Sequence, residues 1–294
     1  MDGQDKDRRS LELGLLLVAN VVGGSSAILI KASTINPVLQ ASYRILFAGI
    51  ILLPFFFREL RRSGLRFSLS LLTPAILPGL ALGLHFITWT LGARMTLAGN
   101  ATVIVTMVPV AMPFFVFLMT RELPRKAEVL GTAVALGGVA ILAAFDFRLE
   151  PDHFGGDIIC FVSMVFYALY LALARRFAPK ERIMLYLVPL YLVGGLFCLI
   201  CALPFADPFH GITGMDIAMT LGLVLGPTIV GHSLMNRAMT RLPPQIVSLS
   251  NLAQFIVAGV MAFALFGEMP RPEFAVASVF IVAGVAIPVV IKKA

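Results

Sequence analysis

Residues 122–125 read Glu-Leu-Pro-Arg and residues 138–141 read Gly-Val-Ala-Ile, and both stretches return 146 positions later in the same order. The second copies are Glu-Met-Pro-Arg at 268–271 and Gly-Val-Ala-Ile at 284–287. Each copy lies among long apolar runs. A duplicated unit embedded in apolar sequence is typical of membrane transporters built from two repeats.

The composition is that of a membrane protein. Hydrophobic residues make up 59% and charged residues 13% of the chain, and its mean hydropathy is +0.94, whereas soluble domains carry about 25% charged residues. The apolar run at 45–57 is short because Arg44 interrupts the sequence just before it, so its helix is expected to begin near Pro37. Ten runs without Asp, Glu, Lys or Arg, most of them near the roughly 20 residues that a spanning helix needs, lie at 13–30, 45–57, 68–93, 95–120, 129–145, 158–174, 183–206, 217–236, 242–267 and 274–291.

Lysine and arginine are distributed unevenly between the two sets of loops. Eighteen lie at the termini or in the loops on the same side as the termini, and only Lys31, Arg94, Arg148 and Arg271 lie in the opposite loops. The positive-inside rule then places both termini in the cytoplasm. These loops explain the net charge of +7, so nucleic-acid binding is an unnecessary hypothesis. No small-residue cleavage site precedes Lys31, and we expect no cleaved signal peptide.

The number of helices in each repeat determines their relative orientation. Because five is odd, a chain that enters the first repeat from the cytoplasm enters the second from outside. The predicted fold class is an all-α membrane protein with ten transmembrane helices in two inverted five-helix repeats, residues 1–147 and 148–294, forming one integrated domain. Glu122 is then cytoplasmic and Glu268 lies on the outer side. Two such halves around a midplane cavity can alternate between inward-open and outward-open forms.

Several short motifs follow one another in the order found in a known family. They are Asn-Val-Val-Gly-Gly-Ser-Ser at 20–26, then Lys31, Pro37 and Tyr43-Arg44, then Pro109 followed by Glu122, and Gly-Pro-Thr-x-x-Gly-His-Ser-x-x-Asn-Arg-Ala at 226–238. From about residue 11 to residue 292 the chain resembles the EamA-type transporters of the drug/metabolite transporter superfamily. The resemblance implies a ten-helix carrier of small metabolites in the bacterial inner membrane, often an exporter of amino acids or related compounds. We expect no cofactor and a functional monomer.

Polar and aromatic residues within the spans are candidates for the cavity, because hydrocarbon penalises them unless they face protein, water or substrate. His85 and Trp89 are four residues apart on one helix, and His232 and Asn236 repeat this spacing on another. The two histidines are 147 positions apart, one more than the repeat offset, and are therefore pseudo-symmetric partners. The full candidate set for substrate binding is Asn20, Gly24, His85, Trp89, Ser163, Tyr167, Tyr170, His232, Asn236, Asn251 and Gln254.

These candidates also have structural interpretations. The histidines can hold helices together through hydrogen bonds, Trp89 can belong to an interfacial aromatic belt, and Tyr167 and Tyr170 can be packing residues. Asn251 and Gln254 can satisfy backbone groups that are freed where a helix is irregular. The sequence leaves these alternatives open.

Four charged residues are assigned gate or structural roles. Arg44 is either a ligand for a substrate carboxylate or a structural clamp that snorkels to the outer surface, and the clamp is favoured. Glu122 and Glu268 each precede a proline where the next helix starts, so they are interpreted as fold elements or gate contacts. Lys31 lies one turn beyond the cavity face of the first helix and joins this group.

Enzyme and channel classes are disfavoured. Residues 231–235 come nearest to a Gly-x-Ser-x-Gly nucleophile motif but end in Met, and the spans contain no mid-helix Asp or Glu to hold magnesium. Cys160, Cys198 and Cys201 all fall within predicted spans, and the Cys198-x-x-Cys201 pair lacks a second pair or nearby histidines, so neither a metal site nor a disulfide is expected. No selectivity ring of the kind a channel needs is recognisable.

The candidate cavity is partly aromatic and partly polar, which suits a zwitterion with an apolar side chain. An amino acid, aromatic ones included, is therefore the favoured small-molecule substrate. A nucleotide-sugar or sugar-phosphate carrier is the first alternative, although anionic cargo calls for more buried cations than Lys31 and Arg44. A multidrug exporter follows, and an intramembrane enzyme is the remote alternative.

Overall fold

The computed structural model describes residues 3–146, 151–209, 211–266 and 272–291. Within these ranges the chain is helical and contains no strand. The helices are α1 (Gly3–Gly23), α2 (Ser26–Lys31), α3 (Pro37–Arg62), η1 (Leu69–Leu71), α4 (Thr73–Met95), α5 (Ala98–Thr106), α6 (Val108–Thr120), α7 (Lys126–Asp146), α8 (Pro151–Phe177), α9 (Met184–Ala202), α10 (Gly214–Leu223), η2 (Val224–His232), α11 (Ser233–Arg241), α12 (Pro244–Asn251), α13 (Ala253–Phe266) and α14 (Pro272–Val290).

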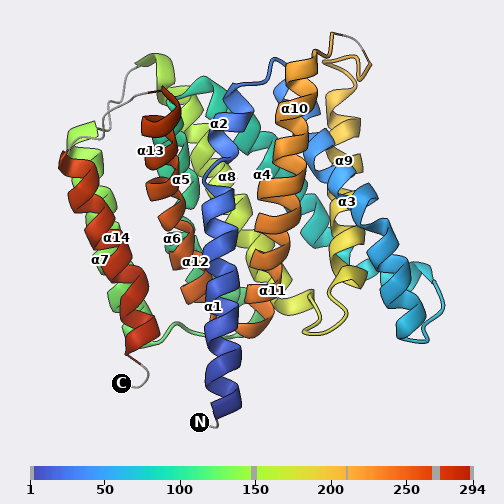
Figure 1. Cartoon of the computed structure of the whole chain (residues 1–294), viewed down its shortest axis with the longest axis horizontal. Coiled ribbons are helices and arrows are strands. Elements are labelled where there is room, and N and C mark those ends of the chain that lie inside the picture. Colours follow the sequence, from blue (N-terminus) through green and yellow to red (C-terminus); the bar gives the residue numbers. More distant parts are fainter. Residues whose placement is uncertain (1–2, 147–150, 210, 267–271, 292–294) are drawn as a thin grey trace.

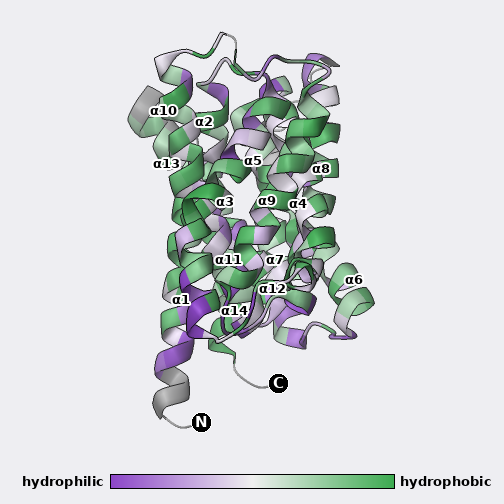
Figure 2. Cartoon of the chain, turned by 90° about the vertical axis from the view of Figure 1, so that its right-hand side faces the viewer, coloured by the Kyte–Doolittle hydropathy of each residue, from purple (hydrophilic) through white to green (hydrophobic). Residues whose placement is uncertain are grey.

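The helices account for the ten predicted spans. Nine helical segments in the described part of the chain are long and apolar enough to cross a membrane. The tenth is α7, whose 21 residues extend over about 30 Å. The second span begins at Pro37, as expected. The start of α1 and the end of α14 lie at the same end of the bundle (Figure 1), and hydrophilic residues gather mainly at its two ends (Figure 2).

The pairing of α7 with α14 reveals the inverted symmetry of the repeats. A Cβ added to Gly131 would lie 2.4 Å from the Gly284 carbonyl oxygen, and one added to Gly138 would lie 2.8 Å from the Ala277 carbonyl oxygen. The 146-residue offset makes Ala277 the counterpart of Gly131 and Gly284 the counterpart of Gly138. Gly131 thus contacts the counterpart of Gly138, and Gly138 contacts the counterpart of Gly131. This reciprocal pattern is the one that a two-fold axis produces. The small residues let the two antiparallel backbones approach closely (Figure 1).

Four spans are interrupted. The first is divided into α1 and α2, the fourth into α5 and α6, and the ninth into α12 and α13, while the eighth contains the π-helix η2 between α10 and α11. The break at Met107 precedes Pro109, and the break at Leu252 falls 145 positions later, so these two are repeat counterparts. Discontinuous helices expose backbone groups, and in transporters such segments line the binding site.

Small residues also bring α4 and α9 together. A Cβ on Gly79 would lie 3.0 Å from the Leu190 carbonyl oxygen, and one on Gly194 would lie 2.8 Å from the Gly79 carbonyl oxygen. A Cβ on Gly83 would lie 2.7 Å from the Phe197 ring. The Gly79-x-x-x-Gly83 spacing thus makes a close helix crossing.

Candidate functional site

A small cavity lies between the two repeats, beside the helix breaks. Its volume is about 30 Å³, so it has room for water but not for a metabolite. Both repeats contribute to its wall. The first supplies Ala19, Gly23, Ser26, Arg44, His85, Phe86, Trp89 and Val105, and the second supplies Tyr167, Pro227, Gly231, His232, Met235 and Gln254.

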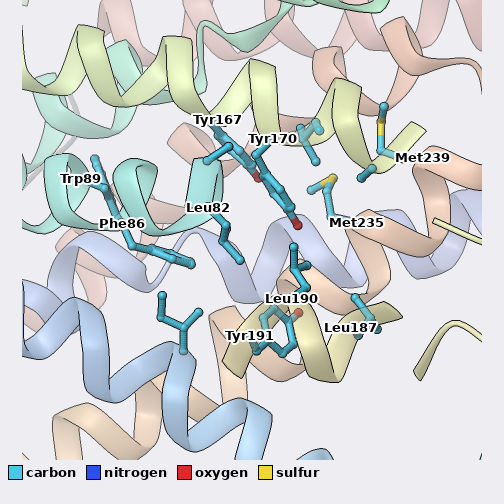
Figure 3. Packing of buried hydrophobic residues seen from close by; sticks show 14 of the residues in the cluster. Leu82, Phe86, Trp89, Tyr167, Tyr170, Leu187, Leu190, Tyr191, Met235 and Met239 are labelled. Carbon is cyan, nitrogen blue, oxygen red and sulfur yellow. The ribbon is translucent and has the colours of Figure 1, made fainter. Parts of the chain in front are cut away.

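Aromatic rings form one side of this cavity. His85 stacks on Tyr167, with ring centroids 4.4 Å apart and an interplanar angle of 20°. The His232 ring lies 4.9 Å from the Phe86 ring and 6.1 Å from the His85 ring. Figure 3 shows Phe86 and Trp89 projecting from α4 toward the space that Tyr167 reaches from α8. The two pseudo-symmetric histidines therefore meet at the cavity, one from each repeat.

Arg44 contributes a fully buried positive charge to the cavity wall. Its Nε donates to Thr228 Oγ1 at 3.2 Å, its Nη1 donates to Ser26 Oγ at 3.2 Å, and its Cζ lies 4.0 Å from the Phe86 ring centroid. No carboxylate in the described part of the chain forms an ion pair with it. Hydroxyls and a ring face compensate a buried charge only in part. The side chain is 0% exposed and does not snorkel, contrary to the expectation from sequence, because it lies on the inward face of α3.

The π-helix η2 positions Thr228 against this guanidinium. Pro227 has no N–H, so it cannot donate to the carbonyl oxygen of Leu223 four residues earlier. The Thr228 hydroxyl donates to that oxygen instead, at 2.8 Å. The wider π turn, a feature frequent at functional sites, thus presents a hydroxyl to Arg44.

The two histidines differ in their hydrogen bonds. His85 Nδ1 lies 2.9 Å from Ser163 Oγ and 3.1 Å from the Ser163 carbonyl oxygen, and the Ser163 hydroxyl also lies 3.0 Å from the His85 carbonyl oxygen, to which it donates. By contrast, His232 Nδ1 is buried and has no hydrogen-bond partner among the described residues. Buried polar atoms without partners are rare and costly. His232 therefore keeps unused hydrogen-bonding capacity at the cavity.

An amide cluster joins the first and ninth spans beside the cavity. Gln254 Nε2 donates to Asn20 Oδ1 at 3.1 Å and to Asn251 Oδ1 at 2.8 Å, and the Tyr167 hydroxyl donates to Asn251 Oδ1 at 3.2 Å. Both amide hydrogens of Gln254 are thus engaged. Its Oε1 faces Gly23, where an added Cβ would come within 2.9 Å, so the glycine leaves this oxygen room beside the cavity.

The predicted binding residues separate into two layers. Five line the cavity, namely His85, Trp89, Tyr167, His232 and Gln254. The other six lie behind them: Ser163, Asn20 and Asn251 hydrogen-bond to lining residues, Asn236 donates to the Tyr170 hydroxyl and to the His232 carbonyl oxygen, and Gly24 packs against Val257. Trp89 is 5% exposed and donates to Ser26 Oγ at 3.2 Å, so it is a cavity residue rather than part of an interfacial belt.

Sequence reasoning missed several lining residues and one that supports them. Phe86 lies directly beside His85 in the chain, and Ser26 and Thr228 stand inside the motifs that indicate the family. The available signal was Arg44 itself, because a buried guanidinium needs acceptors and hydroxyls within spans can supply them.

Of the residues with predicted gate or structural roles, Arg44 lines the cavity, whereas Lys31 and Glu122 lie away from it. Lys31 Nζ donates to the Thr96 carbonyl oxygen at 2.6 Å. Glu122 forms a bidentate ion pair with Arg175, at 3.0 and 2.9 Å, which joins the end of the first repeat's fourth span to α8. This pair borders a pocket of about 460 Å³ that shares no lining residue with the central cavity. Glu268 lies outside the described residues.

Two further carboxylates tie the first and eighth spans at opposite ends. Asp216, at the start of α10, accepts hydrogen bonds from the Ser33 hydroxyl at 2.8 Å and from the Thr34 amide at 2.6 Å. At the other end, Glu12 of α1 pairs with Arg237 of α11 at 2.7 Å. The sequence did not single out these acids because they flank the apolar runs, although both are nearly fully buried.

These features define an inverted-repeat membrane transporter fold. A model of the EamA-like transporter family matches residues 10–144 and 154–290. The chain belongs to this family, whose members are membrane transporters of small molecules. No curated protein matches the chain. A solved structure described as "Crystal structure of protein" is similar over 95% of this chain and 98% of that chain, with 17% sequence identity and a TM-score of 0.75. At that identity the likeness shows the fold.

Proposed function

We propose that the chain exports amino acids, preferring apolar and aromatic side chains, by alternating access around the central cavity. In this proposal it works as a monomer in the bacterial inner membrane, with both termini in the cytoplasm. The observation that carries the proposal is Arg44, a buried guanidinium in the cavity wall without a carboxylate partner among the described residues. A substrate carboxylate would supply the missing charge and form stronger hydrogen bonds than the hydroxyls of Thr228 and Ser26.

The remaining polar atoms suit the rest of an amino acid. Gln254 Oε1 can accept a hydrogen from an ammonium, since both amide hydrogens of this side chain are already used. His232 Nδ1 is free to form another hydrogen bond. The stacked rings of His85 and Tyr167 favour an apolar or aromatic side chain. Phosphorylated cargo fits less well, because Arg44 is the one Lys or Arg among the residues that line the cavity in the described part of the chain.

The size of the cavity and the contacts at its two ends support alternating access. A volume of about 30 Å³ requires the repeats to separate before an amino acid can enter. We assign the contacts of Asp216 with Ser33 and Thr34 to the outer closure, and the pair between Glu12 and Arg237 to the inner closure. Opening one closure while the other holds would expose the cavity to one side at a time.

The test is uptake into liposomes that contain the purified protein. Labelled phenylalanine, phenethylamine and glucose 6-phosphate are compared, because phenethylamine lacks only the carboxylate. The wild type should transport phenylalanine, and Arg44→Lys should lower this uptake by at least about tenfold, since a lost charge-assisted hydrogen bond costs about 1.5–3 kcal/mol. Arg58→Lys is the matched control, because Arg58 lies on the same helix but is exposed.

Three outcomes would contradict the proposal. Equal uptake of phenethylamine would remove the role of the carboxylate. Uptake of glucose 6-phosphate alone would favour the sugar-phosphate alternative. An Arg44→Lys variant that folds normally and transports phenylalanine as well as Arg58→Lys would show that Arg44 is a structural clamp.

A further inference from the structure

A second space lies away from the central cavity, between α5, α7 and α8. It is a groove of about 480 Å³, and nine of its ten lining residues are apolar. The tenth is Asp157. Phe154, Ile158 and Phe161 on the α8 side are 51%, 48% and 52% exposed, so this wall faces lipid in a membrane. The groove and the central cavity share no lining residue.

Asp157 is an unusual component of such a groove. Its side chain is 5% exposed, and its Oδ1 accepts a hydrogen bond from the Thr96 hydroxyl at 2.6 Å. Its Oδ2 is buried and has no hydrogen-bond partner in the described part of the chain. Lys31 forms no ion pair with Asp157, because its ammonium donates to the Thr96 carbonyl oxygen instead.

The hydrogen bond between Thr96 and Asp157 uses only one of the two carboxylate oxygens. It connects the C-terminal end of α4 to α8 and so links the two repeats through Oδ1. A hydroxyl-bearing or amide side chain would make the same link without a charge. A buried carboxylate oxygen that lacks a donor is costly, which points to a partner that binds from the groove.

We propose that this groove binds an amphipathic amine dissolved in the bilayer, with its ammonium at Asp157 and its hydrocarbon chain on the apolar wall. The ammonium supplies both the opposite charge and a hydrogen for Oδ2, and the chain fills the apolar groove. A neutral lipid chain would fill the groove but leave Oδ2 without a donor. A fully polar amine would leave the apolar wall uncovered. The site is separate from the proposed export cavity, so it takes a second class of ligand.

The test measures saturable binding of tritiated dodecylamine to the protein in phosphatidylcholine nanodiscs. Tritiated dodecanol is the uncharged match, and empty nanodiscs give the partition background; the amine is charged at neutral pH, as the lysine side chain is. Asp157→Asn removes the charge, whereas Asp152→Asn, at an exposed position of the same helix, is the control. Ala140→Phe fills the groove from the exposed side of α7 without altering Asp157.

Wild type and Asp152→Asn should bind dodecylamine saturably, and Asp157→Asn and Ala140→Phe should each bind at least tenfold more weakly. Dodecanol should show only background partition. Arg44→Lys should leave dodecylamine binding unchanged, so this proposal and the proposed export function can fail separately. The inference is overturned if Ala140→Phe binds the amine as tightly as Asp152→Asn, if folded Asp157→Asn does so, or if dodecanol saturates equally. Weaker amine binding in Arg44→Lys would also overturn it, because the amine would then lie in the central cavity.

Discussion

The two halves of the central cavity derive from one duplicated sequence, yet their histidines have different surroundings. His85, from the first repeat, is held by Ser163 and stacked on Tyr167. His232, from the second repeat, lies at the end of a π-helix, and its buried Nδ1 has no partner among the described residues. The duplication therefore explains why both rings lie at the cavity. Later divergence of the two sequences gave the rings different hydrogen-bond surroundings. We infer that the wall around His85 is anchored, whereas His232 responds to substrate together with Arg44, the proposed carboxylate ligand from the first repeat.

The largest effect of this difference is expected for His232→Ala. No hydrogen bond of Nδ1 is lost in the empty protein, whereas a bound substrate would lose a partner. Phenylalanine uptake should therefore fall by about 10- to 100-fold, corresponding to about 1.4–2.7 kcal/mol, while the unfolding temperature in detergent should fall less than in His85→Ala. A large drop in unfolding temperature with unchanged uptake would mean that His232 serves to hold the helices together.

His85→Ala should show the opposite pattern. The substitution removes the contacts with Ser163 and the stack on Tyr167, so the free energy of unfolding should fall by about 2–3 kcal/mol. Uptake per folded molecule should fall less than in His232→Ala. The control is Ser163→Ala combined with His85→Ala, because two residues that act through one contact should be non-additive. Additive losses in the double variant would contradict the assigned contact.

The fold was largely predictable because its signals are local and repeated. Hydropathy marks each span, the 146-residue offset links Gly131 with Ala277 and Gly138 with Gly284, and the odd number of spans in each repeat requires the two copies to be inverted. The histidine pair was also predictable, since each histidine lies four residues before a second candidate and the pair is 147 residues apart, one more than the repeat offset. The π-helix was not predictable. Pro227 indicates that one backbone hydrogen bond is missing, but it does not indicate which group donates in its place.

The partners of the buried charges depend on tertiary structure and were therefore missed. Whether Arg44 snorkels or faces inward depends on the rotation of α3 against its neighbours, which a sequence pattern does not specify. Asp157 was overlooked for a related reason, since the apolar run begins one residue after it, whereas α8 begins at Pro151. The ends of apolar runs are where a charged residue can be taken for part of a loop although it is buried in a helix.

The smallest effect is expected for Trp89→Phe, which tests whether the wall around His85 serves only as support. The Phe side chain of this variant keeps an aromatic ring at position 89, but it cannot donate the 3.2 Å hydrogen bond that Trp89 Nε1 donates to Ser26 Oγ. Loss of one neutral hydrogen bond should lower the free energy of unfolding by about 1 kcal/mol and uptake by less than about fivefold.

Ser26→Ala is the informative comparison, because Ser26 Oγ also accepts from Arg44, so its removal should cost more than the change at Trp89. Trp89 is the chain's single tryptophan, and its fluorescence in the wild type reports directly on what enters the cavity. A loss of uptake in Trp89→Phe larger than that in His232→Ala would show that substrate binds mainly to the wall around His85 and would reverse the roles inferred for the two histidines.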